Sequence, residues 1–132
     1  MAEFWTLGHI YTLMKNILPL LTLSLLLTAC RRDASYTSQI IGAWPSSGAD
    51  WKSTTTYNSD GSFSIVSQKQ GESHSAAGTW KIEDGFLTMT TTNSSITNRN
   101  FTVGAVVRYH ISHLDSHELN MDESNHVVRI TR

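Results

Sequence analysis

Cysteine is almost absent from this chain of 132 residues, which has one, Cys30. A single cysteine cannot form an intramolecular disulfide, so the stability of the folded domain must come from packing. Charge clusters are also absent. From Arg31 onward, nine Lys and Arg residues and ten Asp and Glu residues are spread along the chain without a run of either sign. Nucleic-acid binding needs clustered basic residues that neutralise phosphates, so this composition argues against a nucleic-acid partner.

The chain also lacks an apolar run long enough to span a bilayer. Its most apolar stretch, from Ile17 to Leu27, has eleven residues, whereas a transmembrane helix needs about 20. The length of this stretch, Lys15 before it and the small residues after it are typical of a secretory signal peptide. We therefore expect residues 1–29 to be a signal segment.

The start of the chain is unusual for such a signal. Residues 1–13, "MAEFWTLGHIYTL", place Glu3 and aromatic residues where signals normally carry a few basic residues. The stretch "MKNILPL", which begins at Met14, reads as a complete signal start with Lys15 in its positive region. We expect Met14, rather than Met1, to be the true start.

The mature chain has the sequence pattern of an all-β domain. Residues 31–39, "RRDASYTSQ", are polar and without periodicity, which predicts a short tether. Beyond them, short segments rich in Thr, Val, Ile and aromatic residues alternate with turn clusters, and helical spacing of apolar residues is not found. The expected strands are Ile40–Trp44, Lys52–Tyr57, Ser62–Gln68, Ser75–Ile82, Phe86–Thr92, Thr102–His113, Glu118–Met121 and His126–Thr131.

The turns between these segments favour a meander. Gly61 and Gly85 each follow an aspartate, and a glycine at such a position provides the positive φ that tight hairpins require. Leu114–His117 and Asp122–Asn125 are expected to be further turns, and Asn93–Asn100 a longer polar loop.

Alternation gives the expected strands one apolar face. The apolar residues on this face are Phe63 and Ile65, Trp80 and Ile82, Leu87 and Met89, Val107, Tyr109 and Ile111, and Val128 and Ile130. A lone sheet would leave this face and two strand edges uncovered. We therefore predict that residues 40–132 form a small eight-stranded, up-and-down antiparallel barrel.

The end of the apolar segment resembles the lipobox of bacterial lipoproteins. Leu27-Thr28-Ala29-Cys30 matches its pattern of a branched aliphatic residue, two small residues and a cysteine. The resemblance implies cleavage between Ala29 and Cys30, followed by attachment of two or three fatty acyl chains at Cys30. Two or more chains anchor a protein persistently, whereas one holds it reversibly. A plain secretory signal with an unrelated cysteine and a buried N-terminal core helix are the alternatives.

Residues 40–131 are similar to small bacterial lipocalin-like domains. The resemblance rests on Gly42-x-Trp44, on "TYNSDGSFSI" at 56–65, on "GTWKIEDGFLTMT" at 78–90 and on a basic residue in the last strand. It implies that Trp44 closes one end of the barrel and that Arg129 or Arg132 lies against its ring. An aromatic face attracts a guanidinium group by about 1 kcal/mol or more when water is excluded. We favour an interior filled by side chains over a large ligand-binding cavity, because so small a domain needs its aromatic residues for stability.

Catalytic and metal-binding patterns are weak. His110, His113 and His117 lie close together in sequence, but on a strand His110 and His113 should point to opposite sides, so a metal site would need His74 or His126 from a neighbouring strand. Ser73 and His74 are adjacent and would diverge on a strand, and a G-x-S-x-G motif is not found. We expect neither an enzyme nor a cofactor. The carboxylate pairs at Glu83–Asp84 and Asp122–Glu123 fall in expected turns.

Together, these observations predict a monomeric, non-catalytic binding module in the cell envelope. Its expected partners are the membrane, through the lipid anchor, and a small apolar or amphipathic ligand. Arg31 after Cys30, in place of Asp, implies the outer membrane, facing the periplasm, by the sorting pattern of enteric-type lipoproteins. The alternative is an inhibitor or structural partner of an envelope protein, with the loop Ser94–Asn100 as the first candidate for its contact surface.

Overall fold

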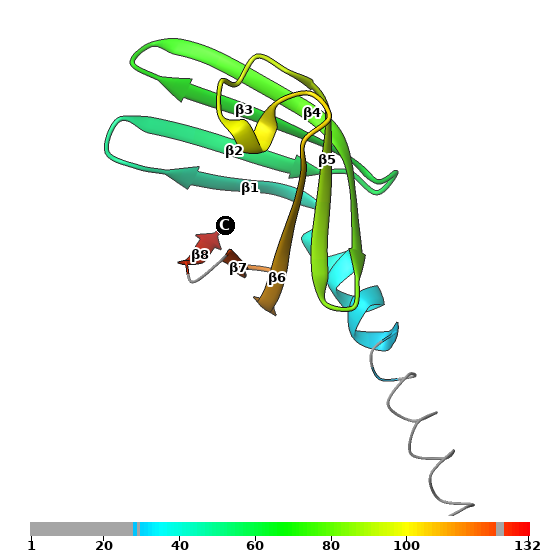
Figure 1. Ribbon diagram of the computed structural model, residues 1–132. Helices are drawn as coiled ribbons and strands as arrows, with labels where there is room; N and C mark the ends of the chain where they lie inside the picture. Colours follow the sequence, from blue (N-terminus) through cyan, green and yellow to red (C-terminus); the bar gives the residue numbers. More distant parts are fainter. Residues whose placement is uncertain (1–27, 29, 124–125) are drawn as a thin grey trace, which may run out of the picture.

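The computed structural model describes residues 28, 30–123 and 126–132 (Figure 1). Outside these residues lie the expected signal segment apart from residue 28, including Met14, Leu27 and Ala29, and the tip of the expected turn at 124–125. The described part contains eight β-strands. They are β1 (Gly42–Ser47), β2 (Trp51–Tyr57), β3 (Ser62–Lys69), β4 (Glu72–Glu83), β5 (Phe86–Ser94), β6 (Val106–Leu114), β7 (Glu118–Glu123) and β8 (His126–Thr131).

The strands form one antiparallel sheet in which each strand pairs with the next along the chain. The sheet curls until β1 and β8 approach each other, but in the described residues the ladder does not continue from β8 to β1. The prediction of an all-β, eight-stranded, up-and-down barrel is confirmed, with a nearly closed rather than a fully closed sheet.

Hairpin turns set the registers of the strands. The expected glycine turns are present, because Gly61 and Gly85 have φ angles of 82° and 76°. The Asp60 carboxylate accepts a hydrogen bond from the Ser62 amide at 2.9 Å. A third tight turn, at Gln70 and Gly71, joins β3 to β4 with positive φ at both residues, as a two-residue hairpin loop requires. This turn makes both strands longer than expected.

The expected boundaries before β6 and at the end of β7 were wrong. The segment 102–105 belongs to the β5–β6 loop, residues 95–105, which contains a short 3-10 helix, η1 (Arg99–Phe101). Asp122 and Glu123, expected in a turn, are the last residues of β7. Each strand extends as far as its neighbour supplies hydrogen bonds, and composition alone does not reveal that limit.

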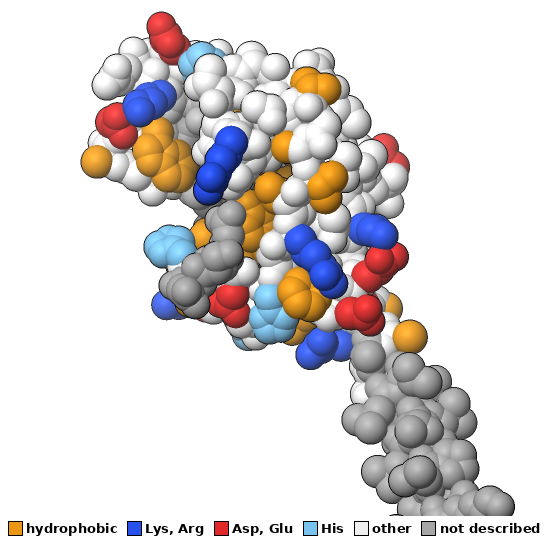
Figure 2. All heavy atoms as spheres, in the orientation of Figure 1, with side chains coloured by type: hydrophobic (Ala, Val, Ile, Leu, Met, Phe, Trp, Pro, Cys, Tyr) orange, Lys and Arg blue, Asp and Glu red, His pale blue; other side chains and the backbone are white. Residues whose placement is uncertain are grey.

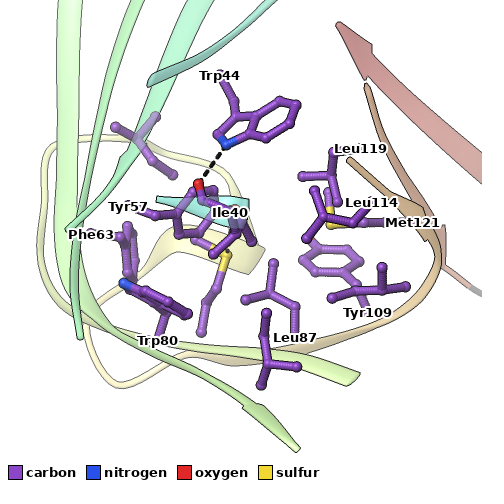
Figure 3. Close-up of a cluster of buried hydrophobic side chains, with 14 of the residues drawn as sticks. Ile40, Trp44, Tyr57, Phe63, Trp80, Leu87, Tyr109, Leu114, Leu119 and Met121 are labelled. Carbon is purple, nitrogen blue, oxygen red and sulfur yellow. Dashed lines mark hydrogen bonds between the residues drawn. The ribbon is translucent and has the colours of Figure 1, made fainter. Parts of the chain in front are cut away.

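The apolar face predicted from alternation is the core of the barrel (Figure 3). Phe63, Ile65, Leu87 and Met89 are at most 4% exposed. The other buried members include Tyr57, Trp80, Ile82, Tyr109, Ile111, Leu114, Leu119 and Met121. Val107, Val128 and Ile130 are half-buried and pack against this core.

Residues 30–40 are helical, which corrects the expectation of an irregular tether and of a first strand that begins at Ile40. Tyr36 and Ile40, four residues apart, lie on one side of the helix; Tyr36 packs against the core and Ile40 is fully buried. The Asp33 carboxylate accepts hydrogen bonds from the amides of Asp84 and Gly85, at 2.7 and 2.9 Å. The helix is therefore docked on the β4–β5 turn.

Trp44 closes the end of the barrel on which this helix lies. Its ring is fully buried, and its Nε1–H donates a hydrogen bond to the Ile40 carbonyl at 2.6 Å (Figure 3). The Arg132 guanidinium stacks over the ring, with Cζ 4.0 Å from the centroid. Gly42 permits this arrangement: its φ is 118°, and a Cβ atom there would lie 2.7 Å from Nη1 of Arg132.

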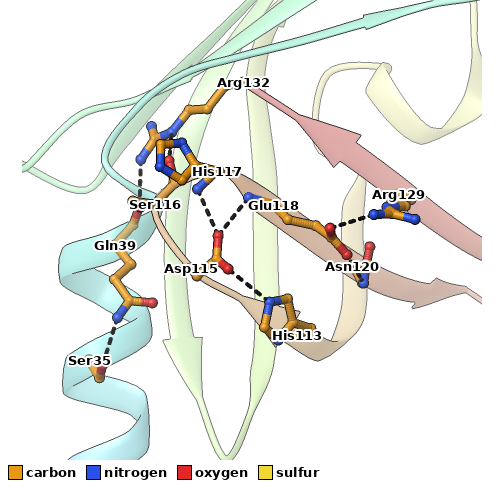
Figure 4. Close-up of polar contacts among 10 residues, drawn as sticks. All are labelled: Ser35, Gln39, His113, Asp115, Ser116, His117, Glu118, Asn120, Arg129 and Arg132. Carbon is orange, nitrogen blue, oxygen red and sulfur yellow. Dashed lines mark hydrogen bonds and ion pairs between the residues drawn. The ribbon is translucent and has the colours of Figure 1, made fainter.

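Of the two arginines expected beside Trp44, Arg132 occupies the position and Arg129 does not. Arg132 also donates to the carbonyls of Gln39, Ile41 and Ser116, at 3.0, 3.0 and 2.8 Å, and so joins the helix, the chain before β1 and the β6–β7 turn (Figure 4). Arg129 lies on the outer face and pairs with Glu118 at 2.6 Å. Since Val128 and Ile130 face inward, strand alternation directs Arg129 outward.

Candidate functional site

A cavity of about 530 Å³ opens at the end of the barrel opposite Trp44. We call this end the mouth; it carries the β1–β2 and β3–β4 turns and the β5–β6 loop. In Figure 1 the helix (cyan) lies at the other end. In Figure 2, hydrophobic side chains are visible inside a hollow in the middle of one face. The interior is therefore not filled by its own side chains, contrary to the favoured expectation.

The cavity walls divide into a polar and an apolar part. On the side of β1 to β3 the lining includes small hydroxyl side chains, namely Ser46, Ser53, Thr55 and Ser67. On the side of β5 to β8 it is almost entirely apolar or aromatic, with Met89, Tyr109, Met121, Val128 and Ile130. The small side chains explain the cavity, because core positions near the closed end hold Phe63, Trp80 and Leu87 instead. Sequence reasoning missed these inward Ser and Thr residues, although their alternation with outward residues was a usable signal.

The rim combines large apolar side chains with a cation. Trp51 is 39% exposed at the start of β2, and Lys69 lies directly opposite it at the end of β3. Ile96 and Phe101 of the β5–β6 loop are half-buried, pack against the core and line the cavity. Backbone hydrogen bonds from Ser95 to Ser75 and from Gly104 to Thr91 fasten both ends of this loop to the sheet. The expected polar loop at 93–100 thus contributes an apolar edge to the mouth.

Tyr57 lies at the base of the cavity. Burial, with a smaller contribution from the neighbouring Tyr109, raises the pKa of its phenol above the ordinary value of 10.0. Its hydroxyl donates to Sδ of Met89 at 3.6 Å. Tyr57 is therefore neutral at physiological pH and offers a hydroxyl group, rather than a charge, to a bound molecule.

The three histidines considered as metal ligands lie outside the barrel. His110 is 3.2 Å from Asp122, and His113 is 3.1 Å from Asp115. The prediction that His110 and His113 point to opposite sides was wrong, since both are exposed. A register shift between Ile111 and His113 explains this, because it places Ser112 and His113 together on the outer face. Within residues 28, 30–123 and 126–132, no group of three or more potential ligands could hold a metal ion.

Asp115 organises the β6–β7 turn at the closed end (Figure 4). Its carboxylate accepts hydrogen bonds from the amides of His117 and Glu118, at 2.7 and 2.8 Å. These two bonds, with a smaller contribution from His113, lower the pKa of Asp115 from 3.8 to about 2. Since the pKa is lower in the folded state, ionised Asp115 stabilises the fold fully above pH 4, and this stabilisation is lost as the pH falls from about 4 to about 2.

We therefore expect Asp115→Asn to unfold at lower urea concentration than the wild type at pH 7, with a difference that shrinks as the pH falls towards 2. Urea midpoints measured at pH 7 and pH 2.5 check this. Asp50→Asn, at the mouth, controls for the loss of one negative charge. An Asp115→Asn difference that is the same at both pH values would contradict the role of the charged carboxylate.

Cys30, the expected lipid attachment site, is exposed at the start of the described helix. It lies three residues before Asp33, which binds the β4–β5 turn at the closed end. The part of the chain that the structure describes contains no helix with both the length and the apolarity needed to cross a membrane.

Comparisons with known proteins support the fold. No protein-family model matches the chain, and no curated protein matches it. A solved structure, a lipocalin-like protein from Bacteroides uniformis ATCC 8492, superposes with a TM-score of 0.57 at 12% identity and covers 71% of this chain and 98% of its own. An uncharacterised protein from Bacteroides eggerthii DSM 20697 superposes with a TM-score of 0.54 at 12% identity and covers 70% and 98%. The chain therefore has a lipocalin-like fold.

Proposed function

We propose that this domain binds a small amphipathic molecule in its barrel and does not catalyse a reaction. The observation that supports this function best is the cavity of about 530 Å³ with one apolar wall and one hydroxyl-bearing wall. Ligand sites of this kind are concave, mostly apolar and supplied with a few polar groups that orient the ligand. Asp and Glu are not among the described lining residues, so the paired carboxylates of glycoside hydrolases have no counterpart among them.

We further propose that Cys30 carries acyl chains that hold the domain at the bacterial envelope, at the outer membrane and facing the periplasm. The lipobox-like Leu27–Cys30 and the neighbouring Arg31 support this. The position of Cys30 is compatible with it, because the helix that follows is docked at the closed end. With this anchor the closed end lies next to the bilayer, and the mouth faces away from it, open to ligands in the surrounding solution.

The proposed lipid anchor predicts both the cell fraction in which the protein is found and its mass. The protein should be recovered from membranes, with a mass that corresponds to a chain beginning at Cys30 plus acyl groups. Cys30→Ser should prevent this modification, while Ser35→Ala, five residues further along, should leave it intact. Intact-mass measurement of the membrane fraction checks the prediction. A freely diffusing wild-type protein with an unmodified thiol would contradict it.

The binding function is tested by purifying the protein under native conditions and analysing the released small molecules by mass spectrometry. We expect an apolar or amphipathic compound at close to one molecule per chain. Its absence, together with failure to take up added amphipathic compounds, would contradict the proposed function.

The alternative, an inhibitor or structural partner of an envelope protein, requires a free contact loop. Within its candidate loop, Ser94–Asn100, the side chain of Ile96 packs against the core. Phe101, which follows the loop, does the same. These contacts favour a role at the cavity mouth over a role as a protruding contact loop. Equal recovery of partner proteins by the wild type and by a variant with a shortened loop would count against this loop as the contact surface.

A further inference from the structure

We propose that the ligand is an anion, namely a carboxylate with an apolar body, whose head group binds Lys69 at the mouth. This inference rests on the proposed function and adds the sign and position of the ligand's charge. It predicts a preference among compounds that share the same apolar body and differ only in the head group.

Lys69 provides the one permanent charge among the described lining residues. It follows Ser67 along the inward face of β3, so its stem follows the cavity wall and its ammonium group reaches the rim. His74 also lines the cavity, and no described lining residue carries a carboxylate. Asp50 and Glu72 lie beside Lys69 and His74 at the rim but do not line the cavity. The permanent charge among the described lining residues is therefore positive, which favours an anionic head group.

Strand pairing brings four rim side chains together. Trp51 is opposite Lys69 across β2 and β3, and Ser67 is opposite His74 across β3 and β4. Directly opposed residues on one face of an antiparallel sheet have Cβ atoms about 5 Å apart. A carboxylate at this position would meet the Lys69 ammonium and the Ser67 hydroxyl, while the Trp51 ring lies against the first atoms of the apolar body.

The ion pair that Lys69 makes in the structure is weak enough to be replaced. Its Nζ lies 3.6 Å from a carboxylate oxygen of Asp50, and both side chains are at least half exposed. Charge-assisted hydrogen bonds are normally about 2.7–2.9 Å long, and exposed pairs contribute little. For comparison, Arg129 and Glu118 are 2.6 Å apart. The ammonium group therefore remains available to a ligand carboxylate.

The apolar body has a matching surface below this head-group site. Ile65 lies one step deeper than Ser67 on the same face of β3, and Met89, Met121 and Val128 form the opposite wall. The arrangement orders the ligand along the barrel axis, with the charge at the rim and the apolar body inside. A permanently cationic compound of the same shape would place its charge beside Lys69 and be repelled.

The test compares decanoate, decanol and decyltrimethylammonium at pH 8, where decanoate is ionised. The full chain is purified as cells produce it. Protein recovered from membranes is placed in lipid nanodiscs, and empty nanodiscs are the control for partitioning of the compounds into lipid. Calorimetric titration should show decanoate binding about 10-fold more tightly than decanol, and the cation more weakly than both. Added salt should reduce the decanoate preference.

Lys69→Gln should remove this preference, so that decanoate and decanol bind the variant with equal affinity. Lys52→Gln is the matched control, because Lys52 is exposed at the same end of the barrel and is not among the lining residues. Equal affinity of the wild type for decanoate and decanol, or an unchanged preference in Lys69→Gln, would overturn the head-group assignment and leave the binding function standing. Failure of all three compounds to bind would count against the binding function itself.

Discussion

Trp44→Ala is expected to lower the free energy of unfolding by about 3–5 kcal/mol, the range measured for truncation of a large buried aromatic side chain. Trp44 is fully buried, and its removal would leave a void between the helix and the core. It would also leave the Ile40 carbonyl without the indole donor and Arg132 without the ring on which it stacks. Because domains of this size have a total stability of about 5–15 kcal/mol, a large fraction of the stability would be lost.

The matched control is Trp51→Ala, which removes the same side chain from the exposed rim. We expect a loss of about 1 kcal/mol or less there. Urea unfolding followed by far-ultraviolet circular dichroism measures both variants without relying on the tryptophan signal that each variant changes. Similar losses for the two variants would contradict the role of Trp44 as the closure of the barrel.

Ser67→Phe is expected to weaken binding of decanoate at least 10-fold, because its ring would occupy the cavity. Ser67 lines the cavity in the middle of the hydroxyl-bearing wall and is half-buried. Ser64→Phe is the matched control: it makes the same chemical change on the same strand, but Ser64 lies on the outer face and is exposed. The control should bind as the wild type does, since a substitution on the outer face leaves the cavity volume unchanged.

Circular dichroism and urea unfolding of both phenylalanine variants separate a blocked cavity from a damaged fold. Ser67→Phe should keep the wild-type spectrum and a cooperative transition, because its ring enters a space that is empty of side chains. Wild-type affinity in a folded Ser67→Phe protein would show that ligands bind elsewhere on the molecule.

The strand architecture was predictable because its signals are local. Gly61 and Gly85 occupy turn positions that require positive φ, and alternation placed Phe63, Ile65, Leu87 and Met89 on one face. Both signals depend on backbone geometry within a few residues of each site, so they can be recognised without knowledge of the rest of the fold.

Features that depend on distant contacts could not be predicted in this way. The helix at residues 30–40 has two apolar contact residues and is fixed by hydrogen bonds that the Asp33 carboxylate accepts from backbone amides more than fifty positions away. The register shift after Ile111, which turns His113 outward, likewise depends on pairing with β7. The local composition of these segments indicates neither the docked helix nor the register shift.

The cavity was missed because it depends on summed side-chain volumes. Alternation identifies which residues face inward, but it does not show whether they meet in the middle of the barrel. Ser53, Thr55 and Ser67 face inward and are too small to do so. A comparison of the sizes of inward residues along each strand would have separated the filled closed end from the hollow mouth.

The methionine methyl groups offer the most direct test of the claim that the barrel holds an amphipathic ligand in its interior. Met89 and Met121 line the cavity and are 3% and 6% exposed. In protein labelled with ¹³C at the methionine methyls, titration with decanoate should shift both signals along one saturable curve that ends at one ligand per chain. Unchanged Met89 and Met121 signals, or shifts that grow without saturation, would contradict interior binding.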